Sequence, residues 1–183
     1  LSSFCRELIC MNSPVFEKKN VLVTGGAGFL GSHLCERLLR EANVICIDNL
    51  SLSSIHNIEH LLPHPYFEFV RHDINEPLRL EDIPELEKFR IEFQGIQEIY
   101  HLACPTSSGR YEEFRTQSLE ANSIGVQMTL KLAVAQRAKY LLASSSVVYG
   151  ATSKDQNRFA EEDEGRVEHL SPHACYDEGK RFA

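Results

Sequence analysis

Residues 24–31 read Thr24-Gly25-Gly26-Ala27-Gly28-Phe29-Leu30-Gly31, and this stretch decides the fold. The short apolar run 21–23 that precedes it predicts a strand buried on both faces. Residues 28–40 follow it with leucines four apart, at 30, 34 and 38, which predicts a helix with one apolar stripe. Glycines spaced G-x-x-G-x-x-G between a strand and a helix are typical of a dinucleotide-binding loop.

Each glycine of this loop has an expected role. Gly25 allows the tight turn, Gly28 lets the backbone approach a pyrophosphate at the helix N-terminus, and Gly31 lets helix and strand pack closely. Asp48 ends the next predicted strand, residues 44–47, at the distance of about 20 residues that the motif requires. Its carboxylate is expected to accept hydrogen bonds from the adenosine ribose. No arginine follows within several residues, which favours NAD over NADP.

Strands and helices alternate along the rest of the chain. Further strands are predicted at 67–70, 99–103 and 140–143, and helices at 53–62, 84–93, 119–138 and 176–183. The helix at 119–138 carries Ile124, Met128, Leu132 and Ala135 on one side. This alternation predicts an α/β fold, a doubly wound parallel sheet of the Rossmann type with right-handed crossovers.

Composition narrows the class of protein. The chain has 183 residues, 25% of them charged, and a net charge of −7, which disfavours binding to nucleic acid. No apolar run reaches the roughly 20 residues that span a bilayer, so no membrane contact is expected from this segment. The six cysteines form no C-x-x-C pair. They are predicted to be free thiols, with Cys35 and Cys46 buried, as in a reducing compartment.

Three polar residues near the end of the chain suggest proton chemistry. Tyr176 and Lys180 lie four apart and so share one helix face. A nearby ammonium lowers the pKa of a tyrosine by favouring the phenolate, which could then accept a proton from a sugar hydroxyl. Ser145, at the end of the fifth predicted strand, could hydrogen-bond the same hydroxyl. The alternative is an exposed helix with a surface tyrosine and lysine.

Two other sets of residues are assigned to the surface. His56, His60 and His64 recur at helical spacing, but Pro63 interrupts the helix and no acid or cysteine joins them. No metal site is therefore predicted. Arg110 and Arg115 could meet a phosphate, although a surface role is favoured.

These motifs resemble the extended short-chain dehydrogenase/reductase family of nucleotide-sugar enzymes, also called the NAD-dependent epimerase/dehydratase family. The likeness runs from about residue 20 to residue 183. The more specific strings resemble the UDP-glucuronate decarboxylases, or UDP-xylose synthases, within that family. These strings are residues 64–78, Tyr100-His101-Leu102-Ala103-Cys104-Pro105 and Ala174-Cys175-Tyr176-Asp177-Glu178-Gly179-Lys180-Arg181.

The resemblance implies a redox-neutral cycle on tightly held NAD. The C4 hydroxyl of UDP-glucuronate is oxidised with Tyr176 as base, the resulting 4-keto sugar loses carbon dioxide, and reduction at C4 gives UDP-xylose. Ser145, Tyr176 and Lys180 are the implied catalytic residues. The implied cofactor-binding residues are Gly25, Gly28, Phe29, Leu30, Asp48, Asn49, Asp73, Ile74, Leu102, Ala103, Thr106, Tyr176 and Lys180.

The sequence departs from the family pattern at several positions. Relatives usually have glutamate where this chain has Val147, and arginine where it has His173; that glutamate is tied to steps at C5 and the carboxylate. The alternatives are therefore a nucleotide-sugar 4,6-dehydratase, a 4-epimerase, or a non-catalytic NAD-binding fragment.

The same resemblance implies how the chain is organised. Residues 1–19 are an N-terminal lead, and residues 20–183 are a Rossmann domain truncated before the C-terminal lobe that holds the UDP-sugar substrate. This fragment alone is expected to be inactive. The full-length protein is expected to be a homodimer that uses the 119–138 helix. The expected location is the cytoplasm, with an upstream Golgi anchor left open.

Overall fold

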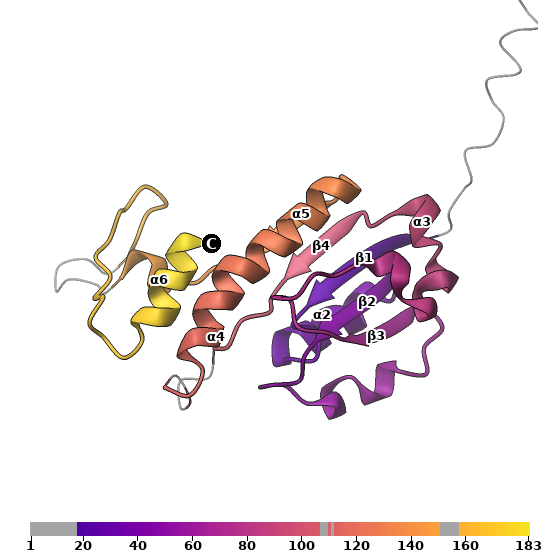
Figure 1. Cartoon of the computed structure of the whole chain (residues 1–183), viewed down its shortest axis with the longest axis horizontal. Helices are drawn as coiled ribbons and strands as arrows, with labels where there is room; N and C mark the ends of the chain where they lie inside the picture. Colours follow the sequence, from indigo (N-terminus) through magenta and orange to yellow (C-terminus); the bar gives the residue numbers. More distant parts are fainter. Residues whose placement is uncertain (1–17, 107–109, 111, 151–157) are drawn as a thin grey trace, which may run out of the picture.

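A parallel sheet of five strands forms the centre of the computed structural model, which describes residues 18–106, 110, 112–150 and 158–183. The spatial order is β3-β2-β1-β4-β5, and every neighbouring pair is parallel; Figure 1 labels β1 to β4. The strands are β1 (Lys19–Thr24), β2 (Ala42–Asp48), β3 (Phe67–Arg71), β4 (Glu98–His101) and β5 (Lys139–Leu142). The chain reverses its direction of travel across the sheet after β3, as in a doubly wound fold. The predicted fold class is confirmed.

Helices connect the strands. They are α2 (Phe29–Leu38), α3 (Ile91–Gln94), α4 (Arg115–Glu120), α5 (Val126–Gln136) and α6 (Ala174–Phe182). A π-helical turn, Ala121–Gly125, joins α4 to α5, so the two form one long rod in Figure 1. Short 3₁₀ turns occupy Ile55–Asn57, Glu59–Leu61, Leu80–Asp82, Pro84–Phe89 and Ser146–Tyr149.

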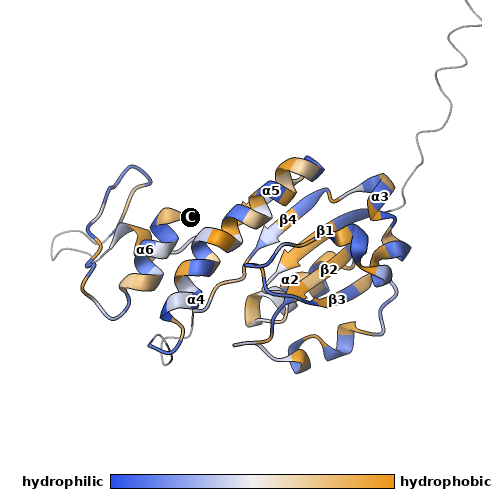
Figure 2. Cartoon of the chain, viewed as in Figure 1, coloured by the Kyte–Doolittle hydropathy of each residue, from blue (hydrophilic) through white to orange (hydrophobic). Residues whose placement is uncertain are grey.

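The core lies on both faces of the sheet. Val21, Val23 and Val44 face the side covered by α2, whereas Leu22 and Ile45 face the opposite side, and all five are fully buried. In Figure 2 the hydrophobic residues gather around β1 and β2, in the middle of the sheet. A strand covered on both faces must be apolar at successive positions, which is why these runs are continuous rather than alternating.

Two predicted helices form differently. The 53–62 segment makes two 3₁₀ turns, because Ile58 between them leaves helical geometry with φ −120°. The 84–93 segment is a 3₁₀ turn followed by α3, and Arg90 between them has a φ of +50° in the left-handed region. Helical spacing of apolar residues is therefore present in both segments without a continuous α-helix.

The predicted apolar stripes hold only in part for the two long helices. On α2, Leu38 is buried and Leu34 packs against the core, but Leu30 is 70% exposed, and the helix also buries Gly31, Ser32 and Cys35. The helix lies so close to the loop that a Cβ at Gly31 would collide with the Gly25 carbonyl, which leaves room only for small residues. On the second rod Ile124 is 42% exposed. The π turn adds a residue per turn and so rotates the buried face away from the predicted positions.

The ends of the domain differ slightly from expectation. β4 ends at His101 rather than residue 103, and the last helix begins at Ala174 rather than residue 176. Residues 1–17 of the expected N-terminal lead and residues 151–157 lie outside the described residues. Among the helices that the structure describes, none is long and apolar enough to cross a membrane.

Candidate functional site at the carboxyl edge of the sheet

The glycine loop turns sharply between β1 and α2. Gly25 has a φ of +69°, and a Cβ there would lie 2.8 Å from the Ala103 backbone, so the position excludes any side chain. Its N–H donates to the Ile47 carbonyl at 2.8 Å, which ties the loop to β2. Gly28 differs: a Cβ there would meet only the Gly25 carbonyl, at 3.2 Å. The space above Gly28 is therefore open, as an approaching pyrophosphate requires.

One cleft of about 800 Å³ opens at this edge of the sheet. It is lined by the glycine loop, by residues at or just beyond the carboxyl ends of β2, β3, β4 and β5, and by α4, the π turn and α6. Every residue predicted to bind the cofactor lines it, from Gly25 to Lys180. Ligands of doubly wound folds bind at this position, outside the carboxyl ends of the strands where the strand order reverses. An adenine dinucleotide fits a cleft of this place and lining.

Asp48 organises one wall of the cleft. One carboxylate oxygen accepts from the Ala27 N–H at 3.1 Å, and the other accepts from the Leu50 N–H at 2.9 Å and from the Ser53 hydroxyl at 2.6 Å. These bonds use three of its roughly four acceptor sites. Asp48 therefore fixes the glycine loop and the following loop to β2, and retains one acceptor site for a ribose hydroxyl.

The next wall is a small polar network. The Asn49 side chain donates to Asp73 at 2.9 Å, and the second Asp73 oxygen accepts from the Asn75 N–H at 2.9 Å. Ile74, only 9% exposed, contributes an apolar surface beside them. A flat purine with polar edges could be held by this combination.

Apolar residues line the rest of the opening. Phe29 and Leu30 are 76% and 70% exposed at the start of α2, where they face the cleft rather than the core. Leu102, Ala103 and Thr106 form the stretch that follows β4. The Ala103 N–H donates to the Thr24 hydroxyl at 3.4 Å, which holds this stretch against β1.

The proposed catalytic residues meet where α6 approaches the end of β5. Tyr176 is 9% exposed and shares a side-chain hydrogen bond with Ser145. The Lys180 ammonium donates to the Ala143 carbonyl at 2.9 Å and lies 6.0 Å from the centre of the Tyr176 ring. Tyr176 and Lys180 line the cleft, as does Ser144, whereas Ser145 is not among the residues that line it. The alternative of an exposed tyrosine and lysine is excluded.

The pKa of Tyr176 is shifted in the direction opposite to the one expected. Burial raises the pKa of Tyr176, and the hydrogen bond with Ser145 offsets only part of this effect. Burial also lowers the pKa of Lys180. The prediction that Lys180 depresses the pKa of Tyr176 is therefore wrong for this state of the protein. Burial is the largest cause of the shift at both residues.

Two buried residues of the site escaped the sequence reasoning. Asn122, on the π turn, is 1% exposed and donates to the Ser118 carbonyl at 2.8 Å and to Cys104 Sγ at 3.1 Å. It packs against Gly179, where a Cβ would lie 3.0 Å from its amide nitrogen. His101 bonds the Thr24 hydroxyl at 2.9 Å, and burial lowers its pKa to about 4. No signal in the sequence singles out Asn122, because the residues around it are a mixture of polar and apolar types.

The residues assigned to the surface lie there. Arg110 and Arg115 pair with Glu113 and Glu112 at 2.6 and 3.1 Å. His56 pairs with Glu59 instead of joining the other histidines. Within the described part of the chain no group of acids, cysteines and histidines could hold a metal ion. Cys35, Cys46, Cys104 and Cys175 are free, as predicted.

Relatives usually have a glutamate at position 147, and the valine of this chain cannot replace its carboxylate. Val147 lies on the 3₁₀ turn Ser146–Tyr149, half-buried, and its N–H donates to the Ser145 hydroxyl at 3.4 Å. Of the acidic residues that the structure describes, only Asp48 and Asp73 line the cleft, and both lie on the side of β2 and β3.

A nucleotide cleft with a tyrosine–lysine pair on the adjoining helix defines a dehydrogenase-like class of Rossmann protein. Comparison with known proteins identifies the family within this class. Residues 21–183 match the model of the NAD dependent epimerase/dehydratase family. The chain belongs to this family.

Curated relatives carry more specific names. The chain is 39% identical to UDP-glucuronic acid decarboxylase 1 of Xenopus tropicalis over 168 residues, which cover 91% of this chain and 36% of that protein. It is 40% identical to UDP-glucuronic acid decarboxylase 4 of Arabidopsis thaliana over 164 residues, 89% of this chain and 33% of that one. The chain thus spans about a third of the length of these relatives.

Solved structures agree on the fold. Epimerase Mth375 of Methanothermobacter thermautotrophicus superposes with a TM-score of 0.69 at 31% identity, covering 91% of this chain and 46% of that one. The dTDP-glucose 4,6-dehydratase of Bacillus anthracis, solved in complex with NAD, gives a TM-score of 0.68 at 27% identity, with coverages of 90% and 47%.

Proposed function

We propose that this chain is the NAD-binding portion of an enzyme that decarboxylates UDP-glucuronate to UDP-xylose through a 4-keto intermediate. One observation carries the proposal: the glycine loop, Asp48 and the Tyr176–Lys180 pair all line the same cleft. The likeness to UDP-glucuronic acid decarboxylases over 91% of the chain selects this activity among those of the family.

Several groups of the cleft suit NAD. The open space at Gly28 and the free amides at the start of α2 would receive the pyrophosphate. Asp48 would take a ribose hydroxyl, and the network of Asn49 and Asp73 with Ile74 would hold the adenine. Thr106, Leu102, Ala103, Tyr176 and Lys180 would surround the nicotinamide end. NAD, when bound, supplies an acceptor and later a donor of hydride at the sugar C4.

Tyr176 would move the proton of the C4 hydroxyl. Its hydrogen bond with Ser145 orients the phenol and places a second hydroxyl beside the same oxygen. Burial raises the pKa of Tyr176 in the free protein, so the residue would have to lose its proton before it accepts the C4 proton, and it would return that proton when C4 is reduced. Lys180 would position this pair, since its bond to Ala143 ties α6 to the end of β5.

The loss of carbon dioxide needs little help from the protein. A ketone at C4 makes the C6 carboxylate the acid of a β-keto acid, so the electrons of the breaking bond pass into the ketone. Val147 places an apolar side chain where relatives usually have a glutamate that is tied to steps at C5 and the carboxylate. The substitution therefore bears on the decarboxylase and the dehydratase alike, and the likeness to the decarboxylases is what favours the first.

Product analysis tests the activity. The chain would be fused to the remaining C-terminal part of the Xenopus tropicalis relative, which supplies the lobe that the chain does not span. Given UDP-glucuronate and NAD, the fusion protein should form UDP-xylose, detected as a loss of 44 Da. A loss of 18 Da would indicate a dehydratase, an unchanged mass with a new sugar an epimerase, and no change a non-catalytic module. The 183-residue chain alone is expected to bind NAD without turnover.

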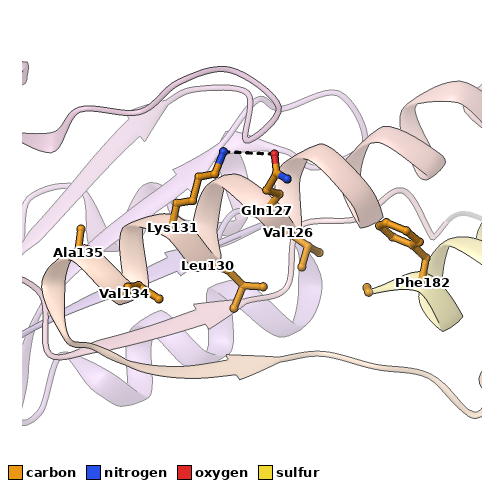
Figure 3. A pocket seen from close by; sticks show the side chains of 8 residues that line it. Val126, Gln127, Leu130, Lys131, Val134, Ala135 and Phe182 are labelled. Carbon is orange, nitrogen blue, oxygen red and sulfur yellow. Dashed lines mark hydrogen bonds between the residues drawn. The ribbon is translucent and has the colours of Figure 1, made fainter.

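We also propose that a second copy covers one face of the long helical rod. An apolar groove of about 510 Å³ runs between α5 and the end of α6. Figure 3 shows Val126, Leu130 and Val134 of α5 along it and Phe182 of α6 at one end. Val134 and Phe182 are 78% and 76% exposed. Exposed apolar residues gathered in one patch are typical of an interface.

A further inference from the structure

Two buried thiols lie directly beneath the glycine loop. Cys35 comes from α2 and Cys46 from β2, and neither side chain has any exposed surface. Both belong to the core cluster that α2 forms with β1 and β2. Neither residue has a part in the function proposed above.

Gly26 marks how closely the two sulfurs approach the loop. A Cβ placed on Gly26 would collide with Cys46 Sγ and would lie 3.3 Å from Cys35 Sγ. Both sulfurs therefore lie against the same point of the backbone. The adjacent Cys35 and burial both raise the pKa of the Cys46 thiol, which keeps Cys46 a poor nucleophile while the loop is in place.

The same stretch of backbone determines where the N–H groups of the glycine loop point. Gly25 and Gly26 both direct their N–H groups to the Ile47 carbonyl, at 2.8 and 3.3 Å, and Ile47 is the neighbour of Cys46. The Gly28 N–H in turn donates to the Gly25 carbonyl at 3.1 Å. A change in the volume or separation of the two sulfurs must therefore shift the loop, because a filled core has no room to absorb it.

We propose that Cys35 and Cys46 form an oxidative modification site whose state is coupled to the glycine loop. In the conformation described here the loop covers both thiols, and local opening of the loop exposes them to an oxidant. The oxidised pair in turn distorts the loop. The effect on NAD rests on the proposed function, whereas the effect on the loop does not.

The chemistry needs only a peroxide. One thiolate attacks a peroxide oxygen, the O–O bond breaks, and a sulfenic acid and water form. The second sulfur then attacks the sulfenic sulfur, the S–O bond breaks, and a second water leaves. Two thiols and hydrogen peroxide thus give one disulfide and two waters, with two electrons passing from sulfur to oxygen. A thiol reductant reverses the change.

Peptide mapping after hydrogen peroxide treatment tests the site on the 183-residue chain. We expect a Cys35–Cys46 disulfide, faster hydrogen exchange at residues 25–31, and NAD binding weakened about tenfold. By the same coupling, saturating NAD should slow the oxidation about tenfold. Dithiothreitol should restore all three properties.

Matched variants separate the causes. Cys46→Ala and Cys35→Ala should each lose the response to peroxide when the treated protein is compared with the same variant untreated, whereas Cys175→Ala should keep it. Absence of the Cys35–Cys46 disulfide, or its formation without any change in exchange at residues 25–31, would overturn the inference. Failure of the reduced protein to bind NAD would count against the proposed function alone, because the disulfide and the exchange rates would still test the oxidative modification site.

Discussion

At the scale of single residues, Tyr176 has the most specific expected role. Replacing it with phenylalanine keeps the ring, which is 9% exposed, and removes only the hydroxyl that bonds Ser145. In the fusion protein described above, Tyr176→Phe should lower kcat by about 10²–10⁴-fold, the range expected when a general acid–base is lost. NAD affinity should stay within about twofold, measured by calorimetry. A variant with unchanged kcat would show that another group moves the proton.

His101 predicts a pH dependence of stability. It is 2% exposed, and its pKa is lowered to about 4 from 6.5 in the folded state. The unfolded chain therefore binds more protons between these two values, so stability falls as the pH drops from 6.5 to about 4 and changes little from this residue outside that window. The loss amounts to about 3 kcal/mol.

Urea denaturation at a series of pH values measures this effect. His101→Gln cannot gain a charge, and its amide can still meet the Thr24 hydroxyl. The variant should be less stable than the parent at pH 7 and should lose less stability between pH 6.5 and 4. Parallel curves for the two proteins would mean that His101 does not carry the acid sensitivity.

At the scale of elements, the π turn is the feature that most affects the cleft. Its last residue, Gly125, lies so close to the wall of the site that a Cβ would be 2.6 Å from the Ile74 side chain and 3.2 Å from Asn75 Oδ1. Gly125→Ala should therefore cost about 2 kcal/mol of stability and push the loop of residues 73–75.

The same substitution should weaken NAD binding several-fold, whereas Ser123→Ala on the same turn should leave both quantities nearly unchanged. Ser123 is a suitable control because its hydroxyl only bonds carbonyls of its own helix, Leu119 and Glu120. Equal effects of the two substitutions would show that the turn does not shape the cleft. Thermal melts and calorimetry give the two measurements.

Much of the element order follows from local pattern. The strands at the centre of the sheet are continuous apolar runs, and the glycine loop is recognisable because Gly25 needs a positive φ and excludes any side chain. Which face of each helix is buried does not follow from the local pattern, since the π turn changes the helical period and α2 packs through its small residues. The bonds of Asp48 to Ala27 and Ser53 depend on how two loops close, which spacing alone does not specify.

The site shows the same division. Residues of the cleft were identifiable because parallel strands bring their carboxyl ends to one edge. The direction in which the pKa of Tyr176 is shifted could not be predicted in this way. It depends on the burial of Tyr176 against α4 and the π turn rather than on its distance from Lys180 along the helix. Asn122 was missed for a related reason: its partners Cys104 and Gly179 are far away in sequence.

At the scale of the whole molecule, the exposed face of α5 and α6 predicts self-association. Val134→Lys places a charge in the middle of the groove and should shift the protein toward monomer in sedimentation equilibrium. Phe93→Lys is the matched control, because Phe93 is 80% exposed on α3, away from the groove. A parent protein that stays monomeric at every concentration would rule out the proposed interface.

The central claim is that the cleft at the carboxyl edge of the sheet binds NAD, and calorimetric titration of the 183-residue chain with NAD tests it most directly. Gly28→Val is the decisive variant, because a Cβ there would meet only the Gly25 carbonyl, at 3.2 Å, and the side chain would enter the space proposed for the pyrophosphate. We expect saturable one-to-one binding by the parent and none by Gly28→Val, with a cooperative thermal melt showing that the variant is folded. No binding by the parent, or equal binding by the two proteins, would contradict the claim.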